Sequence, residues 1–322
     1  MVALQYGFDV PWKHRLATRL APTLRRLRPL PGARHLSDWA QRHFGPSFAG
    51  DDRWAWVDDF DGRLRLRVDR TQHIGATIYW HGGHSLNELA LLRRLVRPGV
   101  VFVDGGAHLG HFSLVAAARG ARVLSIEPVD SVRAQLIANV EANGLTNVQV
   151  SDLALSDRGG KVALFANPNR LHDPVATGVA AFGRTHLLQE ATATTLDALV
   201  RESRLSRVDV IKLDLEGAEL PALRGARGLL QAHHPELILE LSHPLFSAAG
   251  YTQADLLDYL GALGYQVGLI TEYPLSGALH RLELRRYGRV VAVNRMALPE
   301  HCNVFAATPE RFAAVVECSL RA

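Results

Sequence analysis

Hydrophobic runs alternate with amphipathic stretches along most of this chain of 322 residues. Short runs rich in valine, isoleucine and leucine predict strands at residues 100–104, 121–126, 148–155, 208–214, 236–241, 265–271 and 302–308. Stretches with apolar residues at helical spacing predict helices at residues 109–119, 130–142, 216–231, 252–263 and 309–319. This alternation indicates an α/β fold, in which helices cover both faces of a mostly parallel sheet.

The residues before this region follow other patterns. Residues 1–50 predict a basic helical arm, with leucines at helical spacing at Leu16, Leu20, Leu24 and Leu27. Pro22 is expected to interrupt this helix or to begin a new one.

Residues 51–99 predict a small β region followed by a helix. Asp61-Gly62 separates two β-rich runs and signals a hairpin, and residues 74–80 are a candidate further strand. Ser85 and Glu88 have the spacing of a capping box at the start of the helix. We therefore expect three parts, residues 1–50, 51–99 and 100–322.

Composition places the chain among ordinary globular proteins. Hydrophobic residues make up 48% and charged residues 21%, and two cysteines, Cys302 and Cys318, do not indicate a disulfide framework. No apolar run reaches the length of a membrane span, and the first residues lack the order of a signal peptide. These features predict a cytoplasmic protein.

The net charge of +4 is unevenly distributed, because Lys and Arg exceed Asp and Glu by six within residues 1–50. Residues 13–42 therefore form either a helix with a solvated basic face or a surface for an acidic partner or an anionic membrane. No basic patch interleaved with aromatic residues indicates a nucleic-acid partner.

A glycine-rich turn follows the first strand of the α/β region. Asp104 ends the strand, and Gly105, Gly106 and Gly110 precede the next helix. Such a turn brings backbone N–H groups close to a ligand. Glu127 ends the following strand, and an acid about 20 residues beyond the turn is placed to accept hydrogen bonds from a ribose diol. The pair predicts a nucleoside cofactor.

The turn favours a cofactor without phosphate. The dinucleotide fingerprint fits only with Ala107 at its central glycine, and Asp104 would repel a phosphate but attract an ammonium group. S-adenosylmethionine carries a ribose and an ammonium group and has no phosphate. An NAD-dependent oxidoreductase is the alternative from another enzyme class, and a non-catalytic binding scaffold is a further one.

Two later segments add to this picture. At the end of the third strand, Asp152 and the Leu153 backbone are placed beside an adenine. In the run from Lys212 to Glu219, period-two geometry puts Lys212, Asp214 and Glu216 on one face. Ligands of open α/β sheets lie beyond the carboxyl ends of the strands, so we expect Asp214 to face the reacting methyl group. The alternative is that these acids cap a helix with Lys212 as their partner.

Asp214 is the first candidate for a general base, and His243, which follows the strand at residues 236–241, is the second. A magnesium site built from Asp214, Glu216 and Glu240 is an alternative, but no ligand spacing demands it, and we predict no metal.

Several linked motifs resemble one known family. They are Val103 to Ser113, Ile126-Glu127-Pro128, Ala154 to Asp157, Thr195-Leu196-Asp197 and Ile211 to Glu219. In their order and spacing, over roughly residues 72–241, they resemble the FkbM family of S-adenosylmethionine-dependent methyltransferases. The resemblance implies a class I methyltransferase fold with a seven-stranded sheet. It also implies O-methylation of a hydroxyl on a sugar, polyketide or lipid-linked product, with N-methylation on the same fold as an alternative.

The resemblance also implies roles for matching positions. Asp104, Gly106 and Gly110 would hold the methionine part, Glu127 the ribose, and Asp214 would lie by the sulfonium. The family commonly has Asn where His108 stands, and its pattern includes an acid like Glu88. The predicted cofactor-binding residues are Asp104, Gly105, Gly106, Ala107, His108, Gly110, Glu127, Pro128, Asp152, Leu153 and Glu88.

The acceptor is predicted to be a small molecule or a glycolipid. Residues 167–194, which have no clear period, are a candidate lid after a possible hairpin strand at residues 161–166. Contacts to the acceptor are expected from this loop, the N-terminal region and residues 272–301, with His172, Tyr273 and His280 as candidates.

Overall fold

The computed structural model describes residues 10–27, 32–168, 177–178, 183–272, 287–293 and 298–321. The described residues form two compact units, one up to Ser85 and the other from Leu86 onward. The second unit is the larger of the two.

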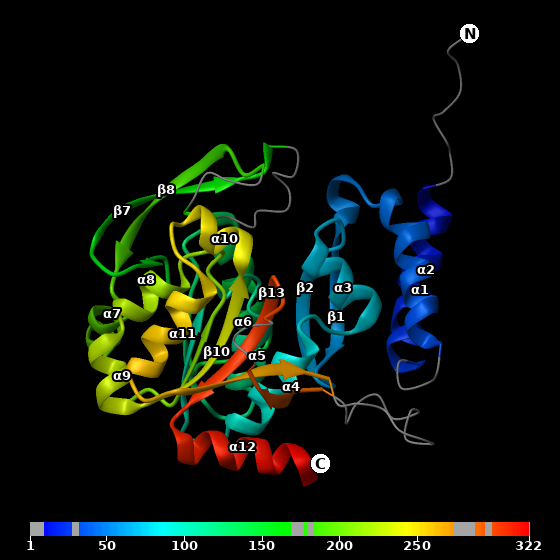
Figure 1. Cartoon of the computed structure of the whole chain (residues 1–322). Coiled ribbons are helices and arrows are strands. Elements are labelled where there is room, and N and C mark those ends of the chain that lie inside the picture. The colour runs from blue at the N-terminus through cyan, green and yellow to red at the C-terminus, as the bar shows by residue number, and fades with distance from the viewer. Residues whose placement is uncertain are drawn as a thin grey trace. The chain divides into compact units, whose positions relative to one another are not determined.

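A large mixed sheet is the centre of the second unit (Figure 1). Its strands are β3 (Val101–Gly105), β4 (Arg122–Ile126), β5 (Val148–Ser151), β9 (Val210–Leu213), β10 (Glu236–Ser242), β11 (Gln266–Thr271), β12 (Arg289–Ala292) and β13 (His301–Ala307). Among the described residues their order is β12-β11-β13-β10-β9-β3-β4-β5. The five strands from β10 to β5 run parallel, whereas β13 is antiparallel to both its neighbours.

Helices cover both faces of this sheet. One layer contains α7 (Leu196–Glu202), α8 (Glu219–Arg224), α9 (Arg227–His233) and α11 (Gln253–Ala262), and its leucines share a buried core with alternate residues of the strands. The other layer contains α4 (Leu86–Leu95), α5 (His111–Ala117), α6 (Asp130–Ala142) and α12 (Pro309–Arg321). The short α10 (His243–Ala248) follows β10 directly. The predicted α/β fold is therefore confirmed.

The prediction of seven strands was wrong by one, because β12 adds a strand at the edge of the sheet. β12 is only four residues long and lies in a region that no motif covers. The predicted strand at residues 148–155 is also divided, since β5 ends at Ser151 and β6 (Ala154–Leu155) belongs to another sheet.

That second sheet has the order β6-β8-β7, with β7 (Gly160–Ala166) antiparallel to β8 (His186–Thr194). The predicted hairpin strand at residues 161–166 is confirmed by β7. The prediction of a loop over residues 167–194 was wrong for its last part, which forms β8.

The first unit is built from helices around one hairpin. It contains α1 (Val10–Leu27), α2 (Ala33–Phe44), the 3₁₀ turns η1 (Gly45–Ser47) and η2 (Gly50–Arg53), the strands β1 (Trp54–Phe60) and β2 (Leu64–Asp69), and α3 (His73–His81). The predicted hairpin is confirmed, because β1 and β2 pair antiparallel across Asp61-Gly62. α1 continues through Pro22 without a break.

Residues 74–80, a candidate strand by sequence, lie in α3, so that prediction was wrong. Their apolar and β-branched side chains suit either element. Tertiary packing decides, since Ile78 and Trp80 are fully buried and Gly82 ends the helix with φ of 75°.

No helix in the described part of the chain is long and apolar enough to cross a membrane.

Candidate functional site

Charged side chains collect where β3, β4, β9 and β10 end. Strand residues alternate between the two faces of the sheet, and Val103, Ile211 and Leu239 belong to the leucine-rich core on one face. Asp104, Lys212 and Glu240 are their chain neighbours and therefore project from the opposite face. The sheet thus brings together residues far apart in sequence.

Asp104 is fully buried at the end of β3. Its Oδ2 accepts a hydrogen bond of 2.5 Å from the Ser113 hydroxyl, and Oδ1 lies 3.9 Å from Lys212 Nζ without a hydrogen-bond partner. Burial raises the pKa of Asp104 more than Lys212 and Ser113 lower it. A buried carboxylate with one unsatisfied oxygen fits a cationic group such as an ammonium.

The backbone N–H groups of the glycine-rich turn are already used by the protein. Those of Gly106 and Ala107 both donate to the Ile126 carbonyl at 3.0 Å, and that of Gly110 donates to the Ala107 carbonyl. The His108 N–H donates to Oε2 of Glu127 at 3.0 Å. These four groups are therefore not arranged to cradle a pyrophosphate.

Packing explains two glycines of the turn. A Cβ at Gly106, where φ is 73°, would collide with the Asp214 carbonyl, and one at Gly110 would collide with Leu136 of α6. His108 has φ of 50°, in the left-handed region where Asn is also favoured. Gly105, where a Cβ would meet a Leu213 methyl group, and the buried Ala107 complete the turn.

Glu127, directly after the neighbouring strand β4, is hydrogen-bonded to the glycine-rich turn. Its Oε2 accepts from His108 and its Oε1 accepts from the Val129 N–H at 2.9 Å. Burial raises the pKa of Glu127 to about 7, against the two backbone hydrogen bonds that lower it. Each oxygen keeps a second lone pair, so the carboxylate can still accept from a ribose diol.

The three residues expected near an adenine and ribose lie at the ends of β4 and β5. The Pro128 carbonyl accepts from Gln189 of β8 at 2.8 Å, which ties this edge to the small sheet. Asp152 is exposed, and the Leu153 N–H donates to Ser151 Oγ at 3.3 Å. The roles of all three residues stay predictions.

Asp214 follows β9, and its side chain is 40% exposed at the sheet edge. Lys212 Nζ lies 3.3 Å from its Oδ2 and 4.8 Å from the centre of the Phe112 ring. Burial lowers the pKa of Lys212, but Asp214 and Asp104 outweigh it and raise that pKa. The lysine is therefore a permanent cation between the two acids.

Glu240 is a site residue whose hydrogen bond to Asp214 the sequence did not indicate. Its pKa is raised, first by the charge of Asp214 and then by burial, and a hydrogen bond joins the two side chains. Glu240 therefore holds the proton of this pair and leaves Asp214 ionised beside Lys212. The sequence indicated Glu240 only as a possible metal ligand, since its strand is remote from the Lys212 segment.

The loop after β9 is strained and held from several directions. Glu216 has φ of 53° and Gly217 has φ of 103°. Glu219, almost fully buried, accepts from the N–H groups of Leu215 and Gly217 at 2.6 and 3.1 Å, and burial raises its pKa to about 7. The Tyr251 hydroxyl donates to the Gly217 carbonyl at 3.0 Å.

Glu216 also connects this loop to residues beside β7 and β8. Arg184 contacts its carboxylate at 2.7 Å, and the Thr177 hydroxyl donates to its carbonyl at 2.7 Å. Burial and Asp214 raise the pKa of Glu216, against the charge of Arg184.

Carboxylate oxygens of Asp214, Glu216 and Glu240 all lie within 4.8 Å of one another, which is compatible with a metal ion. A shared proton and the contacts to Lys212 and Arg184 account for the same cluster, so a metal-free site stays our prediction.

The remaining candidates lie in different places. The Glu88 carboxyl of α4 is buried, bonds to Asn303 of β13, and is within electrostatic range of Lys212 and Asp214. Ser85 has φ of 50° rather than the extended backbone of an N-cap, so the predicted capping box was wrong.

His243 is exposed at the start of α10, where its backbone N–H donates to the Glu300 carbonyl. His172, Tyr273 and His280 lie outside the described residues.

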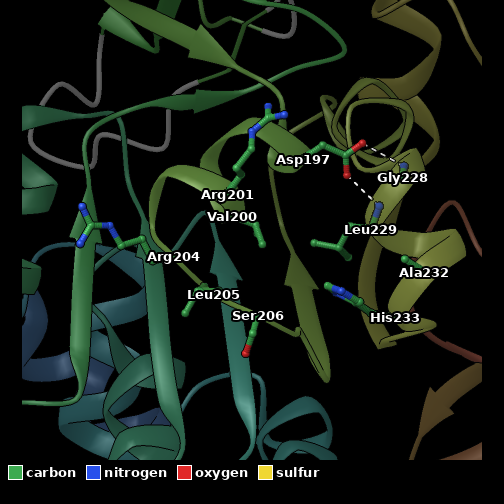
Figure 2. A pocket seen from close by; sticks show the side chains of 10 residues that line it. All are labelled: Asp197, Val200, Arg201, Arg204, Leu205, Ser206, Gly228, Leu229, Ala232 and His233. Atoms are coloured by element: carbon green, nitrogen blue, oxygen red, sulfur yellow. Dashed lines mark hydrogen bonds between the residues drawn. The ribbon is translucent and has the colours of Figure 1, made fainter.

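The Thr195-Leu196-Asp197 motif is structural. The Thr195 hydroxyl caps α7, and the Asp197 carboxylate accepts from the Gly228 and Leu229 N–H groups at 2.9 and 2.8 Å at the start of α9 (Figure 2). Asp197 borders a pocket of about 650 Å³ between α7 and α9. The pocket includes Ser206, which precedes β9, so it lies at the opposite end of that strand from Asp214.

Comparison with known proteins gives matches to methyltransferases and to a synthetase. A sequence model of the methyltransferase FkbM domain matches residues 104–267, just over half of the chain. A stretch of 265 residues is 26% identical to the AMB antimetabolite synthetase AmbE of Pseudomonas aeruginosa, covering 70% of this chain and 12% of that protein.

A stretch of 143 residues is 27% identical to the ribosomal protein L11 methyltransferase of Caldanaerobacter subterraneus, covering 40% of this chain and 45% of that protein. The chain thus spans less than half the length of either curated relative. Methyltransferase FkbM of Methylobacillus flagellatus, a solved structure, is similar at 18% identity with a TM-score of 0.38, covering 67% of this chain and 49% of that one.

Proposed function

Because the chain belongs to the FkbM methyltransferase family, we propose that it transfers a methyl group from S-adenosylmethionine to a hydroxyl group of a small-molecule or glycolipid acceptor. When bound, this cofactor supplies a methyl group activated by the positive charge of its sulfonium.

One observation carries the cofactor assignment. The buried Asp104 has an oxygen without a hydrogen-bond partner, beside a turn in which Gly106, Ala107, His108 and Gly110 donate their N–H groups to the protein. This supports a ligand that brings a cation and no phosphate. It disfavours NAD, whose pyrophosphate needs free backbone donors and no adjacent acid.

The chain's own residues would divide the work. Asp104 and the turn would hold the methionine part, Glu127 the ribose, and Asp152 with Leu153 the adenine. Asp214 is partly exposed at the edge of the sheet and would accept the proton of the acceptor hydroxyl as that oxygen attacks. Lys212 would fix the orientation of its carboxylate, and Glu240, already protonated, would leave it ionised. His243 would be the alternative base.

Calorimetric titration of the whole chain with S-adenosylmethionine and, separately, with NAD tests the proposal. We expect binding of the first only. Asp104→Asn keeps the shape of the side chain but removes its charge, so S-adenosylmethionine should bind about 10- to 100-fold more weakly, the range expected for a hydrogen bond to a charged group. Tight NAD binding without S-adenosylmethionine binding would overturn the assignment.

The acceptor atom needs a second experiment. A screen with labelled S-adenosylmethionine against sugars, glycolipids and polyketide alcohols, with matched amines, separates O-methylation from N-methylation. Label transferred only to amines would contradict the proposed hydroxyl acceptor.

A further inference from the structure

The first unit presents large apolar side chains on the surfaces of its two longest helices. Trp12 and Leu16 of α1 are 48% and 38% exposed, and Leu36 and Trp39 of α2 are both 52% exposed. Exposed residues of this size are usually scattered singly, whereas here two occur on each of two packed helices.

These side chains lie largely outside the buried core of the unit. α1 buries Ala17, Ala21 and Leu24, and α2 buries Ala33, Ala40 and Phe44. At about 100° per residue, Trp12 and Leu16 lie on the side of α1 away from Ala21. By the same spacing, Trp39 lies on the outer side of α2, from which its ring contacts the Phe44 ring edge-on at 5.9 Å between centroids, and Leu36 lies at the flank between the buried and outer sides. The leucine stripe of α1 is thus divided, since Leu24 packs inward while Leu16 faces outward.

The same surfaces are strongly basic. Exposed or half-exposed cations on the two helices are Lys13, Arg15, Arg19, Arg26, Arg34 and Arg42. The two helices contain a single acid, Asp38, and it lies 3.3 Å from His81 of α3. The outer surface therefore combines tryptophan and leucine with an excess of basic over acidic residues.

We propose that the outer faces of α1 and α2 bind the surface of an anionic lipid bilayer. The indole and leucine side chains insert at the level of the headgroups, and the arginines contact lipid phosphates. The helices lie in the plane of the membrane and do not cross it. This attachment is independent of the proposed methyl transfer, since every residue that carries it belongs to the other unit.

The combination of basic and apolar side chains favours a lipid surface over other anionic partners. A nucleic acid or an acidic protein segment would explain the arginines, but it would leave Leu16 and Leu36 in contact with water or phosphate. A lipid headgroup region takes up cationic and apolar side chains together, because phosphates and acyl chains meet there.

Flotation of the full chain with vesicles tests the proposal. Phosphatidylcholine vesicles that contain phosphatidylglycerol should carry the protein, and phosphatidylcholine alone should not. The double variant Arg19→Glu and Arg26→Glu should bind the anionic vesicles about thirtyfold more weakly or worse. Brominated acyl chains should quench tryptophan fluorescence in the wild type, and Trp12→Ala with Trp39→Ala should lose that quenching.

Two matched controls locate the effect. Trp56, 40% exposed on β1, lies under Arg65, and Trp56→Ala should leave vesicle binding unchanged. Arg158→Glu with Arg201→Glu makes the same change of net charge on exposed residues of the other unit and should also have no effect.

The outcomes are decisive when thermal unfolding shows each variant to be folded. No binding to anionic vesicles would overturn the proposal, as would equal losses in the helix variants and the controls. Binding to RNA or to a polyglutamate peptide, with none to vesicles, would also overturn it. These results would leave cofactor binding, and hence the proposed function, untouched.

Discussion

Asp214 and Glu240 form a hydrogen-bonded carboxyl pair with one proton, next to a lysine. Burial and mutual repulsion keep that proton on Glu240, while Lys212 stabilises the negative charge on Asp214. The contact with Lys212 fixes the orientation of this carboxylate. A fixed base aligned with an incoming hydroxyl contributes to catalysis through position as well as proton affinity.

Asp214→Asn should abolish turnover and leave the affinity for S-adenosylmethionine within about an order of magnitude, since a neutral amide keeps the shape but cannot take the proton. Turnover and calorimetry on the same preparation measure both quantities. Asp130→Asn is the matched control, because Asp130 is exposed and pairs with Arg133 on α6. Wild-type rates in Asp214→Asn would remove this residue from the mechanism.

Glu127 is predicted to make cofactor binding depend on pH. Its pKa is raised to about 7, so it is protonated below that pH and ionised above it. Only the ionised form accepts hydrogen bonds from two ribose hydroxyls through both oxygens, so affinity for S-adenosylmethionine should rise as pH increases through about 7. Calorimetry between pH 5.5 and pH 8.5, roughly spanning this transition, should show the rise in the wild type.

Glu127→Gln is the control for that assignment, because an amide does not titrate in this range. It should bind the cofactor more weakly at high pH and with an affinity that hardly changes with pH. A rise in affinity that persists in Glu127→Gln would assign the effect to another group.

A metal-free site makes a simple prediction for chelation. Methyl transfer should be unchanged in excess EDTA, because Glu240 protonation and the cations of Lys212 and Arg184 balance the clustered carboxylates. The assay uses the native chain before and after dialysis against EDTA. Loss of activity that added Mg²⁺ restores would favour the three-carboxylate metal alternative.

Asp197 illustrates how one short motif fixes two neighbouring helices. Its carboxylate accepts from the Gly228 and Leu229 N–H groups in the first turn of α9, while its own backbone belongs to α7. Asp197→Ala should lower the free energy of unfolding by about 1–2 kcal/mol, the range for a lost helix cap. Urea unfolding of the variant and the wild type measures this difference in the free energy of unfolding. Glu202→Ala, an exposed change at the end of α7, should stay within about 0.5 kcal/mol of the wild type. Equal stabilities would contradict the capping role.

Elements with a strong local pattern could be predicted from the sequence, and elements decided by packing could not. The runs that became β3, β4, β9 and β10 have no competing interpretation, because they are short, apolar and followed by turn residues. α3 is equally apolar, and only its burial against the neighbouring helices makes it helical. The predicted helix at residues 216–231 is shorter at its start and divided, because Glu219 holds the first residues in a loop and Asp197 starts a new helix at α9.

The same distinction holds for the site. Asp104, Glu127 and Asp214 could be proposed from sequence because each ends a strand beside a recognisable turn. That Glu240 holds a proton hydrogen-bonded to Asp214 could not, since it depends on the burial of Glu240 and on β10 lying next to β9. Nor could the sequence reveal that the turn's N–H groups are used internally, which adds structural support for a cofactor without phosphate.

Each unit has buried hydrophobic residues of its own, which predicts that a ligand of one unit protects that unit selectively. Trp80 and Phe44 are buried in the first unit, and the leucine-rich core fills the second. S-adenosylmethionine at 100 times its dissociation constant adds about 2.7 kcal/mol to the stability of the state that binds it. If the units open separately, slowly exchanging amides of β3 and β9 should gain protection by that amount, while those of α3 and the β1–β2 hairpin should gain little.

Hydrogen exchange with and without the cofactor measures this difference on the intact chain. Equal protection in both units would show that they unfold as one, because cofactor binding then stabilises every amide that exchanges through global unfolding.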